Sequence, residues 1–414
     1  MSNNPSDSND SRDPERQITF KYEKLRAIGS GILETASVTF LLLIAVRHFD
    51  AGPTAKALVA ASTSIGFLLS PIAVNLVERL GIRTAQAAAA LALLSGLGFL
   101  VTTIFPSLAL FVVGGVLGVS ANSISLPLVT HMLQENYPGS LLGRLFSRTV
   151  MIRIAVAALF SELAGRALTG QLEYYQFLMA IFFLSSLYSA YCLSRCPSQV
   201  IARGPARNPF SGMRFIRTDR VFRRTLICWM LMGFANVMMV PLRIEYIANP
   251  SYGLSLSVSE IALLTGVIPN ISRFIFSPFW GALFDRINFF MLRISINVGF
   301  AIGILSFFTS DSWPGLILGA VLFGLSNAGG DIAGNLWVTK FAPPEKVAEY
   351  MGVHTFFMGV RGIVAPFTGF YLAQELTLAS LGLISAAMIG LATLLLVPEY
   401  CTEKERRAAQ NGTV

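Results

Sequence analysis

A short phrase occurs twice in this chain of 414 residues, and its two copies lie half a chain length apart. Ser70-Pro71 is followed by Leu76-Val77-Glu78-Arg79, and Ser277-Pro278 is followed by Leu283-Phe284-Asp285-Arg286, at a constant offset of 207. A repeat at a fixed offset indicates a duplicated structural unit. Each copy closes an apolar run long enough to cross a bilayer. The repeat therefore predicts two duplicated membrane domains.

The composition supports a membrane protein. Hydrophobic residues make up 54% of the chain and charged residues only 13%, whereas soluble domains are roughly 25% charged. Twelve apolar runs have about the 20 residues that a helix needs to cross a hydrocarbon core. They are residues 26–47, 55–77, 84–105, 107–131, 146–168, 174–194, 225–247, 258–283, 291–309, 314–338, 350–373 and 377–397. We predict an all-α polytopic membrane protein with twelve transmembrane helices in two pseudo-symmetric six-helix bundles.

The basic residues predict the orientation. Of the 31 Lys and Arg residues, 24 lie in or beside the loops on one side, and only Arg47 and Lys56 lie on the other. Cytoplasmic loops are enriched in Lys and Arg, so we expect both termini to be cytoplasmic in a multi-pass protein of the inner cell membrane. The net charge of +8 then reflects topology, and it gives no reason to expect nucleic acid as a partner.

The predicted domains follow from these spans. They are a disordered cytoplasmic tail (1–23), a first six-helix bundle (24–194), a cytoplasmic linker (195–224), a second six-helix bundle (225–398) and a cytoplasmic tail (399–414). In the linker, apolar residues alternate with arginines from Pro209 to Arg224. This pattern favours an amphipathic helix on the inner membrane surface, and a solvated basic linker is the alternative.

Twelve spans in two halves, a long central loop and an acid-Arg turn after spans two and eight resemble the major facilitator superfamily. The turn of that family reads Gly-x-Leu-x-Asp-Arg-x-Gly, followed by basic residues. The second copy keeps Gly281, Leu283, Asp285 and Arg286, with Asn288 in place of the second glycine. The first copy keeps Leu76, Arg79, Gly81 and Arg83, with Val74 for the first glycine and Glu78 for the aspartate.

The resemblance implies a transporter in which two bundles rock against each other. An acid at a helix end can face the positive end of another helix or pair with an arginine, and such contacts break when bundles separate. We therefore expect the two turns to gate the transporter. The gating residues would be Glu78, Arg79, Gly81, Arg83, Gly281, Asp285 and Arg286. The alternative is a pair of loops that only orient the spans.

Ionisable residues inside a membrane are costly and usually mark a functional pathway. Here they are Glu34, Arg153, Glu162, Arg166, Arg273, Asp331 and Arg361. Spans three, six, nine and twelve carry no charge in their interiors, and Arg293 stands at the mouth of span nine. The resemblance implies that these four helices face lipid, so the charges fall on helices that would line a central cavity.

Two acids and three arginines are the site candidates. Glu34 and Asp331 are the candidates for proton coupling, because burial raises the proton affinity of a carboxylate; the alternative is a permanent ion pair with an intramembrane arginine. Guanidinium groups bind carboxylates in a bidentate manner, so an anionic substrate would bind to arginine, and asparagines would add polar contacts. The substrate-binding candidates are Arg153, Arg273, Arg361, Asn270 and Asn327. Arg153 and Arg361 could equally pair with acids for gating.

The function predicted from these features is secondary active transport of a small polar or anionic solute, coupled to protons. Efflux of amphiphilic compounds is one alternative, since the chain has 31 Phe and 13 Met residues. A sensor that keeps the fold without transport is another. The sequence contains no Walker loop, HExxH or Cys-x-x-Cys motif, so we expect no enzyme activity, catalytic residue, metal site or cofactor. We expect a monomer whose partners are the solute, protons and the lipid bilayer.

Overall fold

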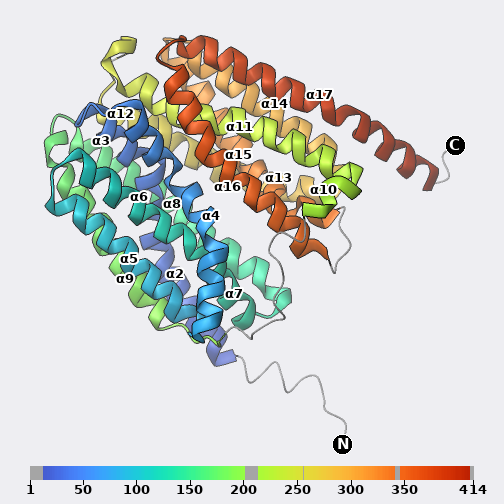
Figure 1. Ribbon diagram of the computed structural model, residues 1–414, viewed down its shortest axis with the longest axis horizontal. Helices are drawn as coiled ribbons and strands as arrows, with labels where there is room; N and C mark the ends of the chain where they lie inside the picture. The colour runs from blue at the N-terminus through green and yellow to red at the C-terminus, as the bar shows by residue number, and fades with distance from the viewer. Residues whose placement is uncertain (1–12, 201–212, 255, 341–345, 411–414) are drawn as a thin grey trace, which may run out of the picture. The chain divides into compact units, whose positions relative to one another are not determined.

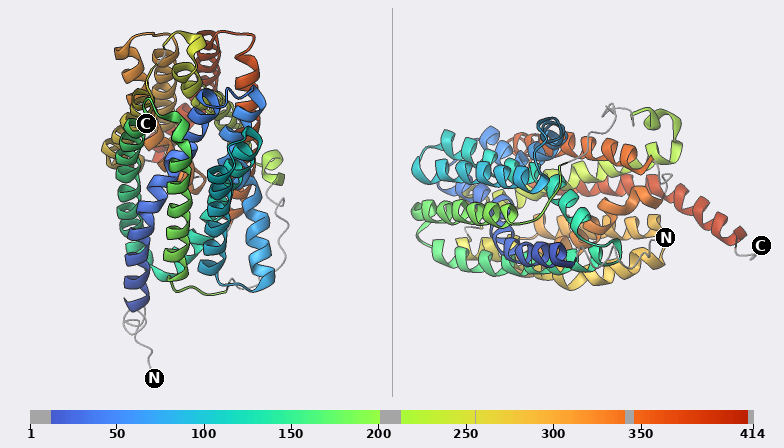
Figure 2. Two further views of the ribbon diagram at one scale, coloured as in Figure 1. Left: turned by 90° about the vertical axis from the view of Figure 1, so that its left-hand side faces the viewer. Right: turned by 90° about the horizontal axis from the view of Figure 1, so that it is seen from below.

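The computed structural model describes residues 13–200, 213–254, 256–340 and 346–410, and nearly all of these residues are helical (Figure 1). The chain forms two compact units, one of residues 1–51 with 58–205 and the other of residues 52–57 with 206–414. Within each unit the long helices run side by side, as two further views show (Figure 2).

The first unit is built from eight α-helices. They are α2 (Asp13–Thr35), α3 (Leu41–Arg47), α4 (Pro53–Leu80), α5 (Thr84–Ile104), α6 (Leu108–Ile124), α7 (Leu126–Asn136), α8 (Gly139–Leu168) and α9 (Tyr175–Ser194). A π-helical turn, η1 (Ala36–Phe40), joins α2 to α3 without a break, and η2 (Leu172–Tyr174) is a single 3₁₀ turn before α9.

The second unit has a similar composition of elements. Its α-helices are α10 (Arg214–Thr218), α11 (Arg220–Ala248), α12 (Val258–Ala262), α13 (Ile268–Arg286), α14 (Phe289–Phe308), α15 (Trp313–Leu336), α16 (Val347–Leu372) and α17 (Leu378–Gln410). A second π-helical turn, η5 (Leu263–Val267), joins α12 to α13, and the 3₁₀ turns are η4 (Pro250–Tyr252) and η6 (Trp337–Lys340).

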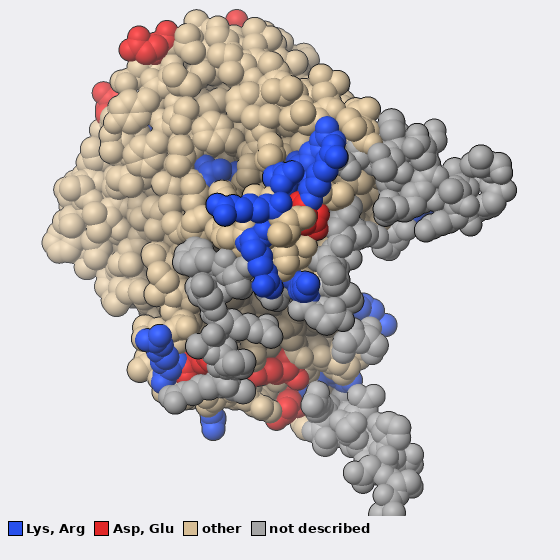
Figure 3. All heavy atoms as spheres, turned by 45° about the vertical axis from the view of Figure 1, so that its right-hand side comes forward, with Lys and Arg blue, Asp and Glu red and all other residues tan. Residues whose placement is uncertain are grey.

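Eleven helical segments of the described chain are long and apolar enough to cross a membrane. The remaining predicted span, 146–168, lies within α8, which is 30 residues long and carries five charged residues spread along its length. Its charged residues are Arg144, Arg148, Arg153, Glu162 and Arg166. Wide areas of the face drawn in Figure 3 carry no charged side chain, as expected where helices meet lipid. The predicted multi-pass helical fold is confirmed.

Helix packing repeats between the two units. In the first unit, α2 packs against α8 and α9, while α5 packs against α6 and α9. In the second unit, α11 packs against α16 and α17, while α14 packs against α15 and α17. If the spans of each half are numbered from one to six, the same four pairs of spans pack together in both units. They are spans one and five, one and six, three and four, and three and six. The predicted pair of pseudo-symmetric bundles is therefore confirmed.

Glycines allow the third and fourth spans of each unit to approach closely. A Cβ added to Gly98 on α5 would lie 2.6 Å from the carbonyl oxygen of Gly114 on α6. A Cβ added to Gly319 on α15 would lie 2.9 Å from the carbonyl oxygen of Gly303 on α14. Each residue of the first pair precedes its counterpart by 205 positions. The duplication thus preserves a backbone-to-backbone contact of the kind that holds membrane helices together.

Some helices extend beyond the predicted domain boundaries. α2 begins at Asp13, inside the segment 1–23 predicted as a tail, because its first turns are packed: Thr19 and Glu23 are buried, and Glu23 Oε1 lies 2.6 Å from Arg26 Nε. Residues 1–12 of that tail lie outside the described residues. At the other end, α17 continues to Gln410, through residues 399–410 that were predicted as a tail.

The linker differs from its prediction. The helix expected from Pro209 to Arg224 is divided at Asp219, where α10 ends and α11 begins; residues 201–212 lie outside the described part of the chain. Asp219 caps α11 by accepting a hydrogen bond from the Phe222 amide at 3.0 Å. The ring of Phe215 is buried and stacks on Tyr350 with a centroid distance of 4.2 Å. Phe215 of α10 thus packs on protein.

The first turn of α4 belongs to the second unit, although the rest of this helix belongs to the first. Lys56 Nζ lies 2.7 Å from Glu245 Oε1 on α11, and the hydroxyl groups of Thr54 and Tyr371 are 2.7 Å apart. Asn249 donates a hydrogen bond to the same Glu245 oxygen at 2.8 Å. These polar contacts explain why residues 52–57 group with the second unit.

The glycine contact leads to a first prediction. Gly98→Ala forces the backbones of α5 and α6 apart and should destabilise the protein by about 1–3 kcal/mol. Gly390→Ala on α17 is the matched control, because no atom lies within 4 Å of its added Cβ; it should be neutral or stabilise by up to about 1 kcal/mol. Thermal unfolding of the purified variants in detergent measures both effects. Equal stability of the two variants would contradict the prediction.

Candidate functional site

An ion pair joins the first and fifth spans of the first unit. Glu34, on the last turn of α2, places Oε2 3.1 Å from Nε of Arg153 on α8. The Glu34 side chain is 20% exposed and the Arg153 side chain 31%. The pair is therefore packed between helices but remains partly accessible. A proton-coupling candidate and a substrate-binding candidate are therefore in direct contact.

A second ion pair joins two spans of the second unit. Nε and Nη2 of Arg273 on α13 lie 2.8 and 2.7 Å from Oδ2 of Asp331 on α15. Asn270 stands one turn before Arg273, and Asn327 stands one turn before Asp331, on two helices that pack against each other. The structure thus brings one coupling candidate into direct contact with one arginine, and each of the two stands one turn after an asparagine candidate on its own helix.

Both ion pairs lie close to an irregular turn of helix. η1 begins two residues after Glu34, and η5 ends three residues before Asn270 and six before Arg273. π-helical turns inside α-helices are frequently found at functional sites. Close packing accompanies the second turn, because a Cβ added to Gly324 on α15 would lie 2.8 Å from Cα of Pro269. In both units, therefore, a charged pair lies within a few residues of a π-helical turn.

Arg361 on α16 has a different partner. Its Nη1 donates a hydrogen bond of 2.7 Å to the main-chain carbonyl of Trp229 on α11. A Cβ at Gly233, one turn further along α11, would overlap this guanidinium group. Arg361 is thus seated against the backbone of α11.

Trp229 also contacts two buried residues that lie near the ends of their predicted spans. Arg293 on α14 is 2% exposed and places Cζ 3.7 Å from the centroid of a Trp229 ring, and His354 on α16 is 1% exposed with its ring centroid 5.2 Å away. By its position in the sequence, Arg293 stands at the mouth of span nine, where a basic residue fits the enrichment of Lys and Arg on the cytoplasmic side. Its burial beside an aromatic ring was therefore missed.

The first acid-Arg turn is made by a glycine. α4 ends at Leu80, and Gly81 adopts φ +65°, the left-handed conformation that glycine tolerates best. The Gly81 amide donates to Glu78 and the Ile82 amide to Val77, both at 3.3 Å. Arg79 and Arg83 are exposed at this turn. Gly81 therefore has a conformational reason to stand where the family pattern has its second glycine.

The beginning of the linker caps the helix that follows this turn. The amide of Ala85 donates to Oγ of Ser198 at 3.1 Å, and the amide of Thr84 donates to the carbonyl of Gln199 at 3.2 Å. Free amides at a helix start require such acceptors, and the side chain of Arg83, the N-cap residue of α5, supplies none. An antiparallel bridge between Arg83 and Val200 adds a backbone contact.

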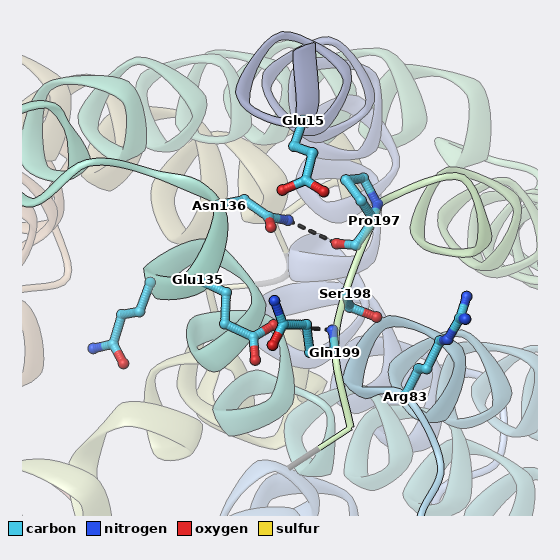
Figure 4. A pocket seen from close by; sticks show the side chains of 8 residues that line it. Glu15, Arg83, Glu135, Asn136, Pro197, Ser198 and Gln199 are labelled. Carbon is cyan, nitrogen blue, oxygen red and sulfur yellow. Dashed lines mark hydrogen bonds between the residues drawn. The ribbon is translucent and has the colours of Figure 1, made fainter. Parts of the chain in front are cut away.

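A polar cavity of about 400 Å³ lies beside this cap (Figure 4). Glu15, Arg83 and Glu135 contribute charged side chains to it. Asn136 spans its inner side by donating hydrogen bonds of 2.7 Å to the Pro197 carbonyl and 2.9 Å to the Thr19 hydroxyl. The start of α2, the first turn, the end of α7 and the linker are therefore held together by hydrogen bonds at one end of the unit.

The second acid-Arg turn uses an asparagine instead of a glycine. α13 ends at Arg286, and Asn288 is the N-cap of α14, with Oδ1 accepting a hydrogen bond of 2.7 Å from the Phe290 amide. The departure from the family pattern thus replaces a left-handed glycine with a helix cap. A Cβ added to Gly281 would find ordinary contact with Ile332 of α15 at 4.0 Å, so helix packing among the described residues does not require a glycine at this position. The side chain of Asp285 lies outside the described part.

The cap on α5 gives a second prediction. Ser198→Ala removes the acceptor of the Ala85 amide, which should lower the free energy of unfolding by about 1 kcal/mol and speed hydrogen exchange in the first turn of α5. Ser295→Ala is the control, because that exposed hydroxyl donates at 3.1 Å to Met291 within its own helix. Hydrogen exchange followed by mass spectrometry measures the local effect, and unchanged exchange at Ala85 would refute the capping role.

Residues 246–413 match the family model of the Major Facilitator Superfamily. No curated protein sequence matches the chain. In the part of the chain that the structure describes, no three His, Cys, Asp or Glu side chains gather as a metal site would require.

Solved structures match nearly the whole chain. The nucleoside transporter NupG superposes with a TM-score of 0.71 at 13% identity, covering 92% of this chain and 99% of that one. A D-xylose-proton symporter gives 0.69 at 16% identity, with 92% and 96% covered. A POT family transporter in complex with a thioalcohol-conjugated peptide gives 0.69 at 11% identity, with 94% and 96% covered. At these identities the likeness shows the fold.

Proposed function

We propose that this chain is a transporter of the major facilitator superfamily, and that it moves a small polar or anionic solute across the membrane by alternating access coupled to protons. The match of residues 246–413 to the family model and the fold of both bundles support the family. The observation that carries the proposal is that the two proton-coupling candidates, Glu34 and Asp331, are each paired with an arginine on another helix, Arg153 and Arg273.

An acid paired with an arginine can couple a proton to an anion. When a substrate carboxylate binds the guanidinium, it displaces the protein carboxylate, which then loses its positive neighbour and holds a proton more tightly. Conversely, protonation of the acid releases the arginine for the substrate. Partial exposure of both pairs supports access by solute and water. Asn270 and Asn327 would then position the polar groups of the solute beside Arg273.

The structural neighbours support a small polar cargo. One is a nucleoside transporter, and another is a D-xylose-proton symporter. We place this protein as a monomer in the inner cell membrane with both termini cytoplasmic, and we assign nucleic acid no part in its function. The two acid-Arg turns would then lie on the cytoplasmic side, where Glu78, Arg79 and Asp285 would form and break contacts as the bundles move.

Efflux of amphiphilic compounds is the second candidate, and one observation favours it. A cavity of about 510 Å³ between α8 and α9 is lined by apolar side chains such as Phe160, Leu168 and Phe177. Phe177 is 71% exposed and Leu163, also in the lining, is 57% exposed, which equally fits a surface facing lipid. A thermal-shift screen of the purified protein against anions, sugars, nucleosides and amphiphiles separates the two candidates, because a ligand stabilises the native state that binds it.

Proton coupling gives a third prediction. In proteoliposomes containing a pH-sensitive dye, a solute that stabilises the wild-type protein should move protons, and Glu34→Gln and Asp331→Asn should each reduce this flux at least tenfold. Glu162→Gln is the matched control, since Glu162 pairs with Arg166 on the same helix, outside the two proposed sites. If both variants of the proposed sites kept the wild-type flux, coupling would not involve these acids. A wild-type protein that bound solute but moved neither solute nor protons would be a sensor.

Anion recognition gives a fourth prediction. Arg273→Gln should weaken binding of an anionic ligand by about 30-fold or more, because a charge-assisted hydrogen bond in a desolvated site contributes at least about 2 kcal/mol. Binding of a neutral ligand should change little. Arg166→Gln, at an exposed arginine, is the control for the loss of one positive charge. Isothermal titration of the purified variants measures these affinities, and equal losses for both ligand classes would exclude a direct role in charge recognition.

A further inference from the structure

The guanidinium group of Arg243 is buried in the second unit, and no carboxylate among the described residues pairs with it. Arg243 is 4% exposed near the end of α11, and its Nε and Nη1 atoms find no hydrogen-bond acceptor among the described residues. The acid nearest in sequence, Glu245, instead forms its ion pair with Lys56. A buried charge normally has a paired counter-charge, so this arginine requires one that the described side chains do not supply.

Aromatic rings hold the arginine in place but do not meet this requirement. Cζ of Arg243 lies 3.4 Å from the ring centroid of Phe323 on α15 and 6.0 Å from that of Phe307 on α14. The face of an aromatic ring attracts a cation. It offers no acceptor to the N–H groups at the edge of the guanidinium, which therefore remain desolvated donors.

A small cavity adjoins these donors. Arg243 and Asn236, two turns apart on one face of α11, line it together with apolar side chains and glycines of α14 and α15, among them Phe300 and Gly319. Its volume of about 10 Å³ has room for about one water molecule. Asn236 Oδ1 is buried and also lacks a partner. Rotation of the amide by 180° exchanges its oxygen and nitrogen, so the same side chain can present its N–H groups to the cavity.

We propose that this cavity binds one anion of halide size, such as chloride or bromide, between the guanidinium of Arg243 and the amide of Asn236. Two sets of donors and an otherwise apolar lining suit a single negative ion. A water molecule fits the space and accepts these hydrogen bonds, but it leaves the positive charge uncompensated. A carboxylate needs more space than a single halide ion, and its carbon atom would have to lie against the donors or the apolar lining. The site is distinct from the Glu34–Arg153 and Arg273–Asp331 pairs and does not depend on the proposed substrate.

The test is the thermal unfolding of the purified full-length protein in detergent, with sodium chloride or bromide replacing sodium gluconate at constant ionic strength. The midpoint should rise with halide concentration and saturate, because the ion binds only the native state. Sodium acetate should give no saturable rise. Arg243→Gln should abolish the halide effect, and Asn236→Leu should raise the half-saturating concentration by about tenfold, since one donor to the ion is lost.

Arg293→Gln is the matched control. Arg293 is also buried and lies over an aromatic ring, but it does not line this cavity, so its variant should keep the wild-type halide response. If Arg243→Gln does not fold, the neutral change Asn236→Leu decides the question. The proposal is overturned if the wild type shows no saturable halide response, if Asn236→Leu keeps the wild-type half-saturation, or if acetate acts as well as chloride.

Discussion

Charge neutralisation inside a medium that solvates ions poorly is the constraint to which the rest of this structure conforms. An unpaired ion in such a medium costs more than most packing interactions return. Glu34 is therefore joined to Arg153, and Asp331 to Arg273, each within one unit. Each pair also ties together two helices that carry the candidate site. The same interaction thus stabilises the bundle and, in the proposed mechanism, would provide the chemistry, because a proton would replace the arginine and a substrate anion would replace the acid.

The helices around these pairs are held by close backbone contact. Lipid chains are as apolar as leucine, so burial of apolar side chains drives helix association much less in a membrane than in water. Small residues compensate by letting helices approach until van der Waals contacts are dense. The glycines at 98 and 114, and their counterparts at 303 and 319, do this between the third and fourth spans of each unit. In the second unit this crossing holds α15, the helix that carries Asp331, against α14.

Much of the architecture could be predicted from the sequence, because hydropathy and a matched repeat are properties of the chain itself. The repeated turn predicted the duplication, which the fold confirms, and the family model matches residues 246–413. Pairing could not be predicted in the same way. Whether Glu34 meets Arg153 depends on how two distant helices pack, so coupling and permanent pairing both remained open. The cap on α5 could not be predicted for the same reason, because the accepting hydroxyl of Ser198 lies 113 residues after the Ala85 amide in the sequence.

The order in which the paired charges are synthesised differs between the two units. Glu34 lies on the first span and its arginine on the fifth, so an acid enters the membrane four spans before its partner exists. In the second unit the arginine comes first, on the eighth span, and its acid follows only two spans later. An unpaired acid can enter the bilayer protonated and neutral, whereas arginine cannot shed its proton in this way. During biosynthesis, therefore, the residue that waits four spans for its partner is an acid, and the residue that waits only two spans is an arginine.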